Sequence, residues 1–282
     1  MKWNAYARLM RLDKPIGILL LWFPVAFALW IANHGAPPLI LVFYFLCGSI
    51  VMRSAGCVVN DLADRHIDIH VRRTSIRPIT TGEISIPKAL LVFIFLVFIA
   101  FYIMTQLPAN CFYYALAALF VTILYPFCKR WIEAPQLILS LAFSVSIPMV
   151  YTASNVQFNS VMFLLLAINI FWVIAYDTLY AMVDREDDLK LGVKSTAVLF
   201  ASYDRWIIAV LQIFMHILWL LIAYQLQATQ QFYLGWGCAG LILIYQQWLI
   251  NKRVPRDCFK AFQWSIGYGF VMWFSVCMLY LS

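Results

Sequence analysis

Two short acidic segments contain the residues of this sequence that are best suited to bind a cation. The first runs from Asn60 to Asp68 and the second from Asp184 to Asp188, with Asp177 ahead of it. On a helix, residues spaced by four or seven positions lie on one face. Helical structure would therefore align two sets of oxygens, which are Asn60, Asp64 and Asp68 in one and Asp177, Asp184 and Asp188 in the other.

Aligned carboxylates repel one another and destabilise a helix unless a cation neutralises them. Oxygen-only ligand sets favour Mg²⁺ over zinc or copper, and Mg²⁺ usually combines one or two carboxylates with the phosphates of a substrate. We therefore predict metal ligands at Asp64, Asp68, Asp184 and Asp188, with a diphosphate held between two metals. The alternative is a pair of ordinary solvated acidic loops, but the presence of two related motifs favours the metal site.

Basic side chains near the motifs could bind the same diphosphate. The candidates are Arg72, Arg73 and Arg77 after the first motif, Lys190 and Lys194 after the second, and Lys129 and Arg130 shortly after Tyr125. Arginine and lysine form charge-assisted hydrogen bonds to phosphate oxygens. Arg53 lies two helical turns before Asn60 inside an apolar segment, where burial of a charge is costly. A buried arginine requires an anion, so we predict that Arg53 binds a substrate.

The composition limits the kind of protein that can carry these motifs. The chain has 282 residues, of which 64% are hydrophobic and 12% are charged, and its mean hydropathy is +0.83. A globular chain is about half apolar and about a quarter charged, so disorder and a water-soluble domain are excluded. Most of the seven cysteines lie in apolar runs and are interpreted as buried thiols rather than as disulfides or metal ligands.

Nine segments are long and apolar enough to span a bilayer as helices. They are 16–32, 38–58, 88–106, 108–127, 135–153, 160–180, 206–225, 233–250 and 264–281. They do not alternate as barrel strands do. The first is too long for the apolar part of a cleavable signal peptide, so we expect it to remain as an anchor. The predicted fold is an all-α integral membrane protein with nine transmembrane helices.

The charged residues all fall on one side of this predicted bundle. The connections at 33–37, 107, 154–159 and 226–232 contain no Lys, Arg, Asp or Glu. Basic connections face the cytoplasm, so we predict a cytoplasmic N-terminus and a periplasmic C-terminus. The net charge of +7 is then a topology signal, and no nucleic acid is expected as a partner.

The two acidic motifs share the pattern D-R-x-x-D and follow predicted spans four helices apart. This is a weak internal duplication, with related motifs at 60–68 and 177–188, inside a single membrane domain of residues 1–282. Repeats in membrane proteins often frame a central site.

Three segments resemble the UbiA superfamily of membrane prenyltransferases, namely Asn60–Asp68, Tyr125–Arg130 and Tyr176–Arg185. Three others resemble its 4-hydroxybenzoate polyprenyltransferase branch, namely Leu9–Gly17, Met52–Cys57 and Lys194–Ala197. The resemblance implies a central cavity that opens to the cytoplasm and laterally to lipid. It also implies Mg²⁺-dependent transfer of a polyprenyl group from polyprenyl diphosphate to the 3-position of 4-hydroxybenzoate. That reaction belongs to ubiquinone biosynthesis and would place the protein in a bacterial inner membrane.

The same resemblance suggests roles for individual residues. Asn60 would orient a metal ligand or a phosphate oxygen. Arg53 would lie near the carboxylate of 4-hydroxybenzoate, with Arg130 as a second candidate, and Asp177 would be an orienting acid or the proton acceptor. The groups expected to hold phosphate oxygens are Arg73, Arg77, Tyr125, Lys129 and Lys194.

The sequence also allows alternatives to transfer of a polyprenyl group to 4-hydroxybenzoate. A different acceptor within the superfamily, such as homogentisate, a naphthoate or haem, is the main alternative. An ion-coupled transporter is disfavoured because the opposite face of the predicted bundle has no charges. A zinc site at His66 and His70 is disfavoured because these residues point away from the acidic face and lack cysteine partners.

Overall fold

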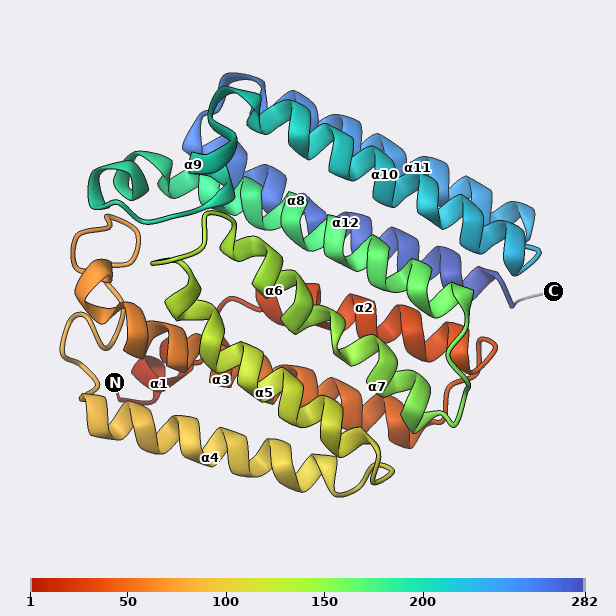
Figure 1. The fold of residues 1–282 in the computed structure, drawn as a ribbon, viewed down its shortest axis with the longest axis horizontal. Helices are drawn as coiled ribbons and strands as arrows, with labels where there is room; N and C mark the ends of the chain where they lie inside the picture. The colour runs from red at the N-terminus through yellow and green to blue at the C-terminus, as the bar shows by residue number, and fades with distance from the viewer. Residues whose placement is uncertain (1, 281–282) are drawn as a thin grey trace.

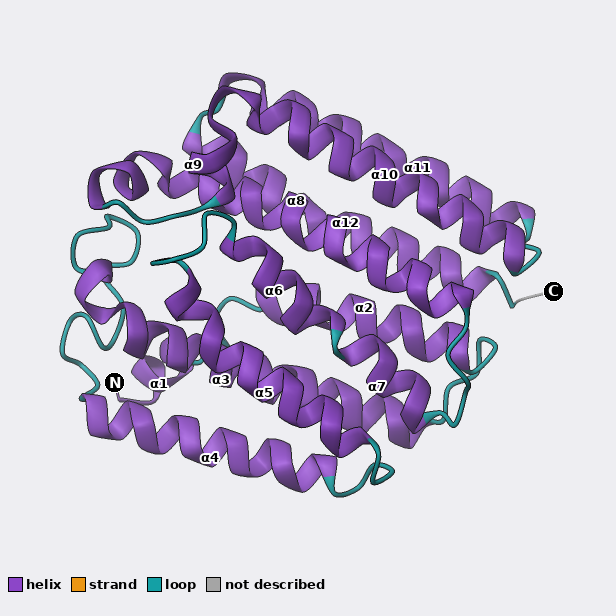
Figure 2. Ribbon diagram, in the orientation of Figure 1, coloured by secondary structure: helices purple, strands orange, loops and turns teal. Residues whose placement is uncertain are grey.

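The computed structural model describes residues 2–280, and this part of the chain is all helical, with no strand (Figure 2). The last predicted span, 264–281, ends one residue outside the described part. The helices are α1 (Lys2–Leu9), α2 (Ile16–Ala32), α3 (Leu39–Asp68), α4 (Ile86–Met104), α5 (Cys111–Cys128), α6 (Pro135–Ser144), α7 (Ser146–Ala153), α8 (Ser160–Leu191), α9 (Thr196–Phe200), α10 (Asp204–Gln225), α11 (Gln230–Leu249) and α12 (Pro255–Met278). Two short 3₁₀ turns, Ala201–Tyr203 and Ile250–Lys252, complete the described helical structure.

Each predicted span falls on one long helix, except that 135–153 is divided into α6 and α7 at Val145. The break has a local cause, because Pro148 lacks the N–H that would bond to the Ser144 carbonyl. Within the described residues, six segments meet both the length and the hydropathy needed to cross a membrane, and α2 is a shorter apolar helix. The chain is therefore an integral membrane protein, while the count of nine crossings stays a prediction.

Helix boundaries follow from local chemistry. Proline occupies the first turn of α4, α6 and α12, where its missing N–H is not needed. The side chain of Asn159 caps α8 by accepting a hydrogen bond from the Met162 N–H at 3.0 Å. The same helix ends at Gly192, whose φ of 67° is the left-handed conformation that glycine adopts readily.

The long helices run side by side along the longest axis of the molecule, with α4 at one edge and α10 and α11 at the other (Figure 1). In the centre, the ring centre of Trp172 on α8 lies 6.2 Å from that of Phe27 on α2 and 5.9 Å from that of Tyr268 on α12. The outer helices expose large apolar side chains that suit contact with lipid. They include Leu91, Phe95, Phe98 and Tyr102 of α4 and Ile213, Phe214 and Ile217 of α10.

The two longest helices, α3 and α8, extend beyond the predicted spans and contain the acidic motifs. Both helices end at the same end of the bundle, where α1, α9 and the connections 69–85 and 192–195 also lie (Figure 1). We call this the charged end. The end of α12 lies at the opposite end of the bundle. The motif residues are therefore helical, as their spacing requires.

A buried ion cluster joins three segments at the charged end. The Asp204 side chain is fully buried and accepts hydrogen bonds from Arg185, in the second acidic motif, and from Arg253. The distance from Arg253 Nε to Asp204 Oδ1 is 3.0 Å. Arg185 thus points away from the acidic face and fixes the end of α8 against α10 and the α11–α12 connection.

We expect Asp204→Asn to destabilise the folded protein, because it leaves two arginines without their carboxylate. Removing one partner of a buried ion pair costs about 3 kcal/mol, which should lower the thermal unfolding midpoint in detergent by several degrees. Glu186→Gln is the matched control, since Glu186 is exposed in the same motif as Arg185. Equal unfolding midpoints for Asp204→Asn and the control would show that the cluster contributes little.

Candidate active site

A cavity of about 390 Å³ lies at the charged end, between the ends of α3 and α8. Twelve of the thirteen predicted site residues line it. They are Arg53, Asn60, Asp64, Asp68, Arg73, Arg77, Tyr125, Lys129, Asp177, Asp184, Asp188 and Lys194. The two acidic motifs, far apart in the sequence, therefore face one shared space.

The first motif is held by a lysine from the end of α5. Lys129 Nζ donates to Asn60 Oδ1 at 3.0 Å and to Asp64 Oδ2 at 2.8 Å. The other carboxylate oxygen, Asp64 Oδ1, is buried and has no hydrogen-bond partner among the described residues. A buried carboxylate oxygen without a partner is costly unless a ligand satisfies it.

Asp68 is held by Arg77, which comes from the connection after α3. Arg77 Nη1 lies 2.6 Å from Asp68 Oδ2 and 3.0 Å from Asp61 Oδ1. Burial works against the charge of Arg77, but Asp61 and Asp68 raise its pKa above the ordinary arginine value. Arg11 Nη2 also lies 2.8 Å from Asp61 Oδ1, so one buried carboxylate joins α3 to two connections.

Arg11 and Asp61 are not among the predicted site residues, although both line the cavity. Asp61 is adjacent to Asn60 in the sequence, but it is rotated by about 100° around the helix and so leaves the predicted face. The sequence held one signal, because Asp61 closely follows the apolar segment 38–58, and a carboxylate that is buried there needs a cationic partner.

The second motif is held by Arg73. Its guanidinium forms an ion pair with Asp184 and donates a hydrogen bond to the Tyr180 hydroxyl. The guanidinium carbon also lies 4.6 Å from the centre of the Tyr180 ring. The connection after the first motif thus reaches across the cavity to the second motif.

Arg53 contrasts with the other arginines that line the cavity. Arg8, Arg11, Arg73 and Arg77 form ion pairs in the described part of the chain. Arg53 Nε is buried and has no hydrogen-bond partner, and the described residues provide no ion pair for this side chain. The Tyr176 hydroxyl, in the same cavity, is also buried and finds no hydrogen-bond partner within residues 2–280. The cavity therefore has an unsatisfied cation that an anionic substrate could neutralise.

Arg130 is the predicted site residue that does not line the cavity. Its Nη2 atom donates to the Ala63 carbonyl at 2.8 Å. Lys194 lines the rim, where Nζ lies 2.6 Å from Glu133 Oε1. His66 and His70 are exposed and do not line the cavity.

The donor set of the cavity fits Mg²⁺. Among the described residues, no group of three or more His, Cys, Asp or Glu side chains is arranged to hold a metal. Each motif instead offers a pair of carboxylates, and Asp64 has an unsatisfied oxygen. Mg²⁺ commonly takes one or two carboxylates and completes its shell with phosphate and water.

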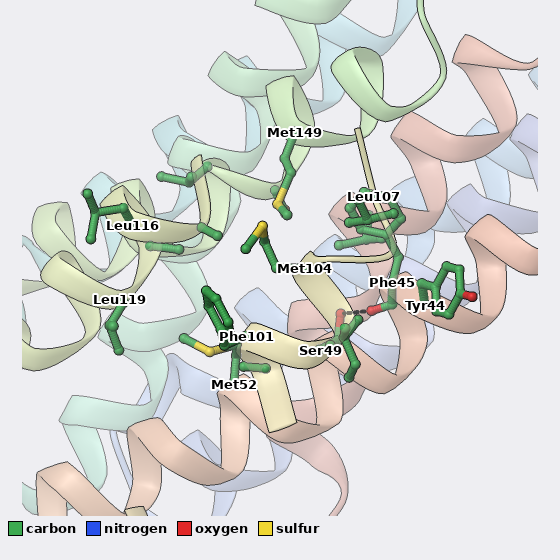
Figure 3. Close-up of a pocket in the computed structure, with 18 of the residues that line it drawn as sticks. Tyr44, Phe45, Ser49, Met52, Phe101, Met104, Leu107, Leu116, Leu119 and Met149 are labelled. Atoms are coloured by element: carbon green, nitrogen blue, oxygen red, sulfur yellow. Dashed lines mark hydrogen bonds between the residues drawn. The ribbon is translucent and has the colours of Figure 1, made fainter. Parts of the chain in front are cut away.

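A second cavity of about 260 Å³ adjoins the first and is almost entirely apolar (Figure 3). The two cavities share Leu21, Met52 and Ala142. The two serines of the second cavity add little polarity, because their hydroxyls already bond to the backbone. Ser49 donates to the Phe45 carbonyl at 2.8 Å and Ser146 to the Phe143 carbonyl at 2.9 Å. A polar, charged cavity thus continues into an apolar one between α2, α3, α4, α5, α6 and α7.

Comparisons with known proteins agree with this geometry. The UbiA prenyltransferase family matches residues 21–274. A 4-hydroxybenzoate octaprenyltransferase of Legionella pneumophila (strain Corby) is 57% identical over 274 residues, which are 97% of each chain. The protein with the same name from Actinobacillus pleuropneumoniae serotype 3 (strain JL03) is 46% identical over 98% of this chain and 94% of the relative.

Solved structures show the same fold. The apo structure of a UbiA homolog from Aeropyrum pernix K1 superposes with a TM-score of 0.80 at 17% identity, covering 92% of this chain and 96% of the homolog. A UbiA homolog from Archaeoglobus fulgidus bound to GPP and Mg²⁺ gives a TM-score of 0.71 at 20% identity, covering 95% of this chain and 99% of the homolog. The resemblance predicted from the acidic motifs is confirmed, and the chain belongs to the UbiA prenyltransferase family.

Proposed function

We propose that this protein is an Mg²⁺-dependent enzyme that transfers a polyprenyl group from polyprenyl diphosphate to the 3-position of 4-hydroxybenzoate, a step of ubiquinone biosynthesis. The observation that carries the proposal is a single cavity lined by both acidic motifs, by their basic partners and by an unpaired arginine. The names of relatives that are 46% and 57% identical over nearly the full chain support the choice of substrates.

The proposed metal ligands are Asp64 and Asp68 on α3 and Asp184 and Asp188 on α8. When bound there, Mg²⁺ would neutralise the diphosphate and so stabilise the charge that develops on the leaving oxygen. Asn60 orients Asp64 or a phosphate oxygen through the lysine that they share. The proposed phosphate donors are Arg73, Arg77, Tyr125, Lys129 and Lys194.

In the reaction, the allylic carbon–oxygen bond breaks and its electron pair leaves on the diphosphate. The ring carbon ortho to the hydroxyl forms the new carbon–carbon bond and then loses its proton. Tyr176, Tyr180 and Phe262 line the cavity with aromatic faces, which attract an allylic cation and help to exclude water. Asp177 lines the same cavity and is our candidate for accepting the ring proton or for orienting the acidic groups.

The apolar cavity is the proposed path of the prenyl chain. We expect Gly48→Trp to block it, since a Cβ added at Gly48 meets nothing within 4 Å and the residue lines the cavity. Losing the burial of two or three methylene groups lowers kcat/KM with octaprenyl diphosphate about 30-fold. Dimethylallyl diphosphate, which is too short to reach the substitution, should keep its activity.

The control for this variant is Gly237→Trp on α11, which also has open space at the Cβ position. An equal loss with the long and the short donor, or no loss with either, would exclude the apolar cavity as the path of the chain.

We further propose that the charged end faces the cytoplasm, because basic connections are retained on that side. In this orientation all nine predicted spans cross a bacterial inner membrane, with the N-terminus in the cytoplasm and the C-terminus in the periplasm. The lipid bilayer would then supply the polyprenyl donor, and the cytoplasm would supply 4-hydroxybenzoate.

The function is tested with detergent-purified protein, Mg²⁺, octaprenyl diphosphate and 4-hydroxybenzoate, with the product identified by mass spectrometry. We expect 3-octaprenyl-4-hydroxybenzoate to form and excess EDTA to stop its formation. The same assay with homogentisate and with a hydroxynaphthoate tests other acceptors. Transfer to one of these in preference to 4-hydroxybenzoate would contradict the proposed substrate, and transfer without a divalent cation would contradict the proposed cofactor.

A further inference from the structure

A close contact between α2 and α3 bears on how the acceptor is chosen. Gly17, in the first turn of α2, lies directly against the side chain of Arg53 on α3. A Cβ atom added at Gly17 would lie 2.3 Å from Arg53 Nε, 2.5 Å from Nη2 and 2.7 Å from Cζ. All three are guanidinium atoms, and a Cβ cannot lie so close to any of them.

Glycine at this position needs a reason, because glycine destabilises a helix relative to alanine. The missing side chain leaves a notch in α2, and the guanidinium of Arg53 occupies it. Gly17 and Arg53 both line the main cavity. The notch therefore determines where Arg53 lies, which is the cavity arginine without an ion pair in the part of the chain that the structure describes.

We propose that Gly17 is a specificity-determining residue, which holds the Arg53 guanidinium in the position that recognises the carboxylate of the acceptor. This inference rests on the proposed function, in which Arg53 binds that carboxylate. Arginine recognises a carboxylate through a planar fork of N–H groups, so its affinity depends on where the plane lies. Gly17 touches no substrate in this scheme and acts through Arg53 alone.

Alanine at position 17 would displace the guanidinium without removing its charge. For Gly17→Ala we expect the KM for 4-hydroxybenzoate to rise about tenfold, while kcat and the KM for the diphosphate change less than about twofold. The preference for 4-hydroxybenzoate over its neutral analogue 4-hydroxybenzamide should fall by a similar factor. Gly237→Ala, at a helix position with open space, is the control and should behave as the wild type.

A double-mutant cycle separates this role from simple packing. In an Arg53→Ala background, Gly17→Ala should have no further effect on kcat/KM for 4-hydroxybenzoate, because the group that it displaces is gone. Arg53→Lys in the Gly17→Ala background should restore part of the acceptor affinity, since an ammonium has no fork to collide with the methyl group. The two double variants, Gly17→Ala with Arg53→Ala and Gly17→Ala with Arg53→Lys, still test the role of Gly17 if Gly17→Ala alone folds poorly.

The outcomes distinguish the inference from the function on which it rests. Wild-type protein that does not prenylate 4-hydroxybenzoate would overturn both. An active wild type with an unchanged acceptor KM in Gly17→Ala would overturn the role of Gly17 alone. The same would follow if Gly17→Ala caused an equal loss with and without Arg53, since the residue would then act on packing rather than through the guanidinium.

Discussion

Asp64→Asn is expected to reduce kcat at saturating donor, acceptor and Mg²⁺ by at least about 1,000-fold, because a metal that neutralises the leaving group supplies several kcal/mol. Asparagine keeps the size of the side chain and one oxygen, so the cavity should keep its shape. Asp184→Asn should have an effect of the same order, since the two motifs are proposed to act on one diphosphate. Product formation with purified protein measures both.

The control for these variants is Glu186→Gln, which removes one carboxylate from an exposed position between Asp184 and Asp188. It should retain full activity. Circular dichroism and gel filtration in detergent should show the same helicity and monodispersity for all variants. Near-normal turnover in either aspartate variant, with activity that survives excess chelator, would rule out the two-metal scheme.

The positions of the helices could be predicted from the sequence because a membrane helix is apolar on all sides and is visible in composition alone. A break within such a helix is harder to predict from composition. The segment 135–153 has uniform hydropathy, yet it breaks at Val145, where Pro148 removes a backbone hydrogen bond. The helices extend beyond the predicted spans, which end at residues 58 and 180, because helical hydrogen bonding continues past the apolar region to Asp68 and Leu191.

The shared face of each acidic motif could likewise be predicted, because helical periodicity fixes it. The partners of the motifs could not be assigned in this way. Lys129 and Arg130 are neighbours at the end of α5, and a rotation of about 100° sends one into the cavity and the other to the Ala63 carbonyl. Arg73 and Arg77 lie in an irregular connection, so their pairing with Asp184 and Asp68 depends on its path in space. The individual roles of these residues remain proposals.

The pairing has a consequence for the catalytic cycle. In the structure, three of the four carboxylates proposed to bind metal are paired with basic side chains proposed to bind phosphate. The pairs are Asp64 with Lys129, Asp68 with Arg77 and Asp184 with Arg73. When a cation and a diphosphate bind, these ion pairs would separate. The carboxylates would then contact the cation, and the basic side chains would contact the phosphate oxygens. The basic residues thus satisfy part of the acidic motifs before the substrate arrives, and we expect them to compete with the metal for the oxygens that they contact.

Lys129→Met tests this exchange because it should change two measured quantities in opposite directions. Losing a charge-assisted hydrogen bond to phosphate is worth about 3 kcal/mol at most, so the KM for the diphosphate should rise up to about 100-fold. The Mg²⁺ concentration for half-maximal activity should fall, because Asp64 Oδ2 no longer has an ammonium at 2.8 Å. The KM for 4-hydroxybenzoate should not change.

Lys252→Met, at an exposed position beyond α11, is the control for the loss of one positive charge. A general effect of net charge on the binding of diphosphate would appear in both variants, whereas an exchange at Asp64 would appear in Lys129→Met alone. An Mg²⁺ requirement that rises in Lys129→Met would mean that the lysine holds Asp64 ready for the metal rather than competing with it. The sign of that shift therefore decides whether the ion pairs of the cavity oppose metal binding or prepare the site for it.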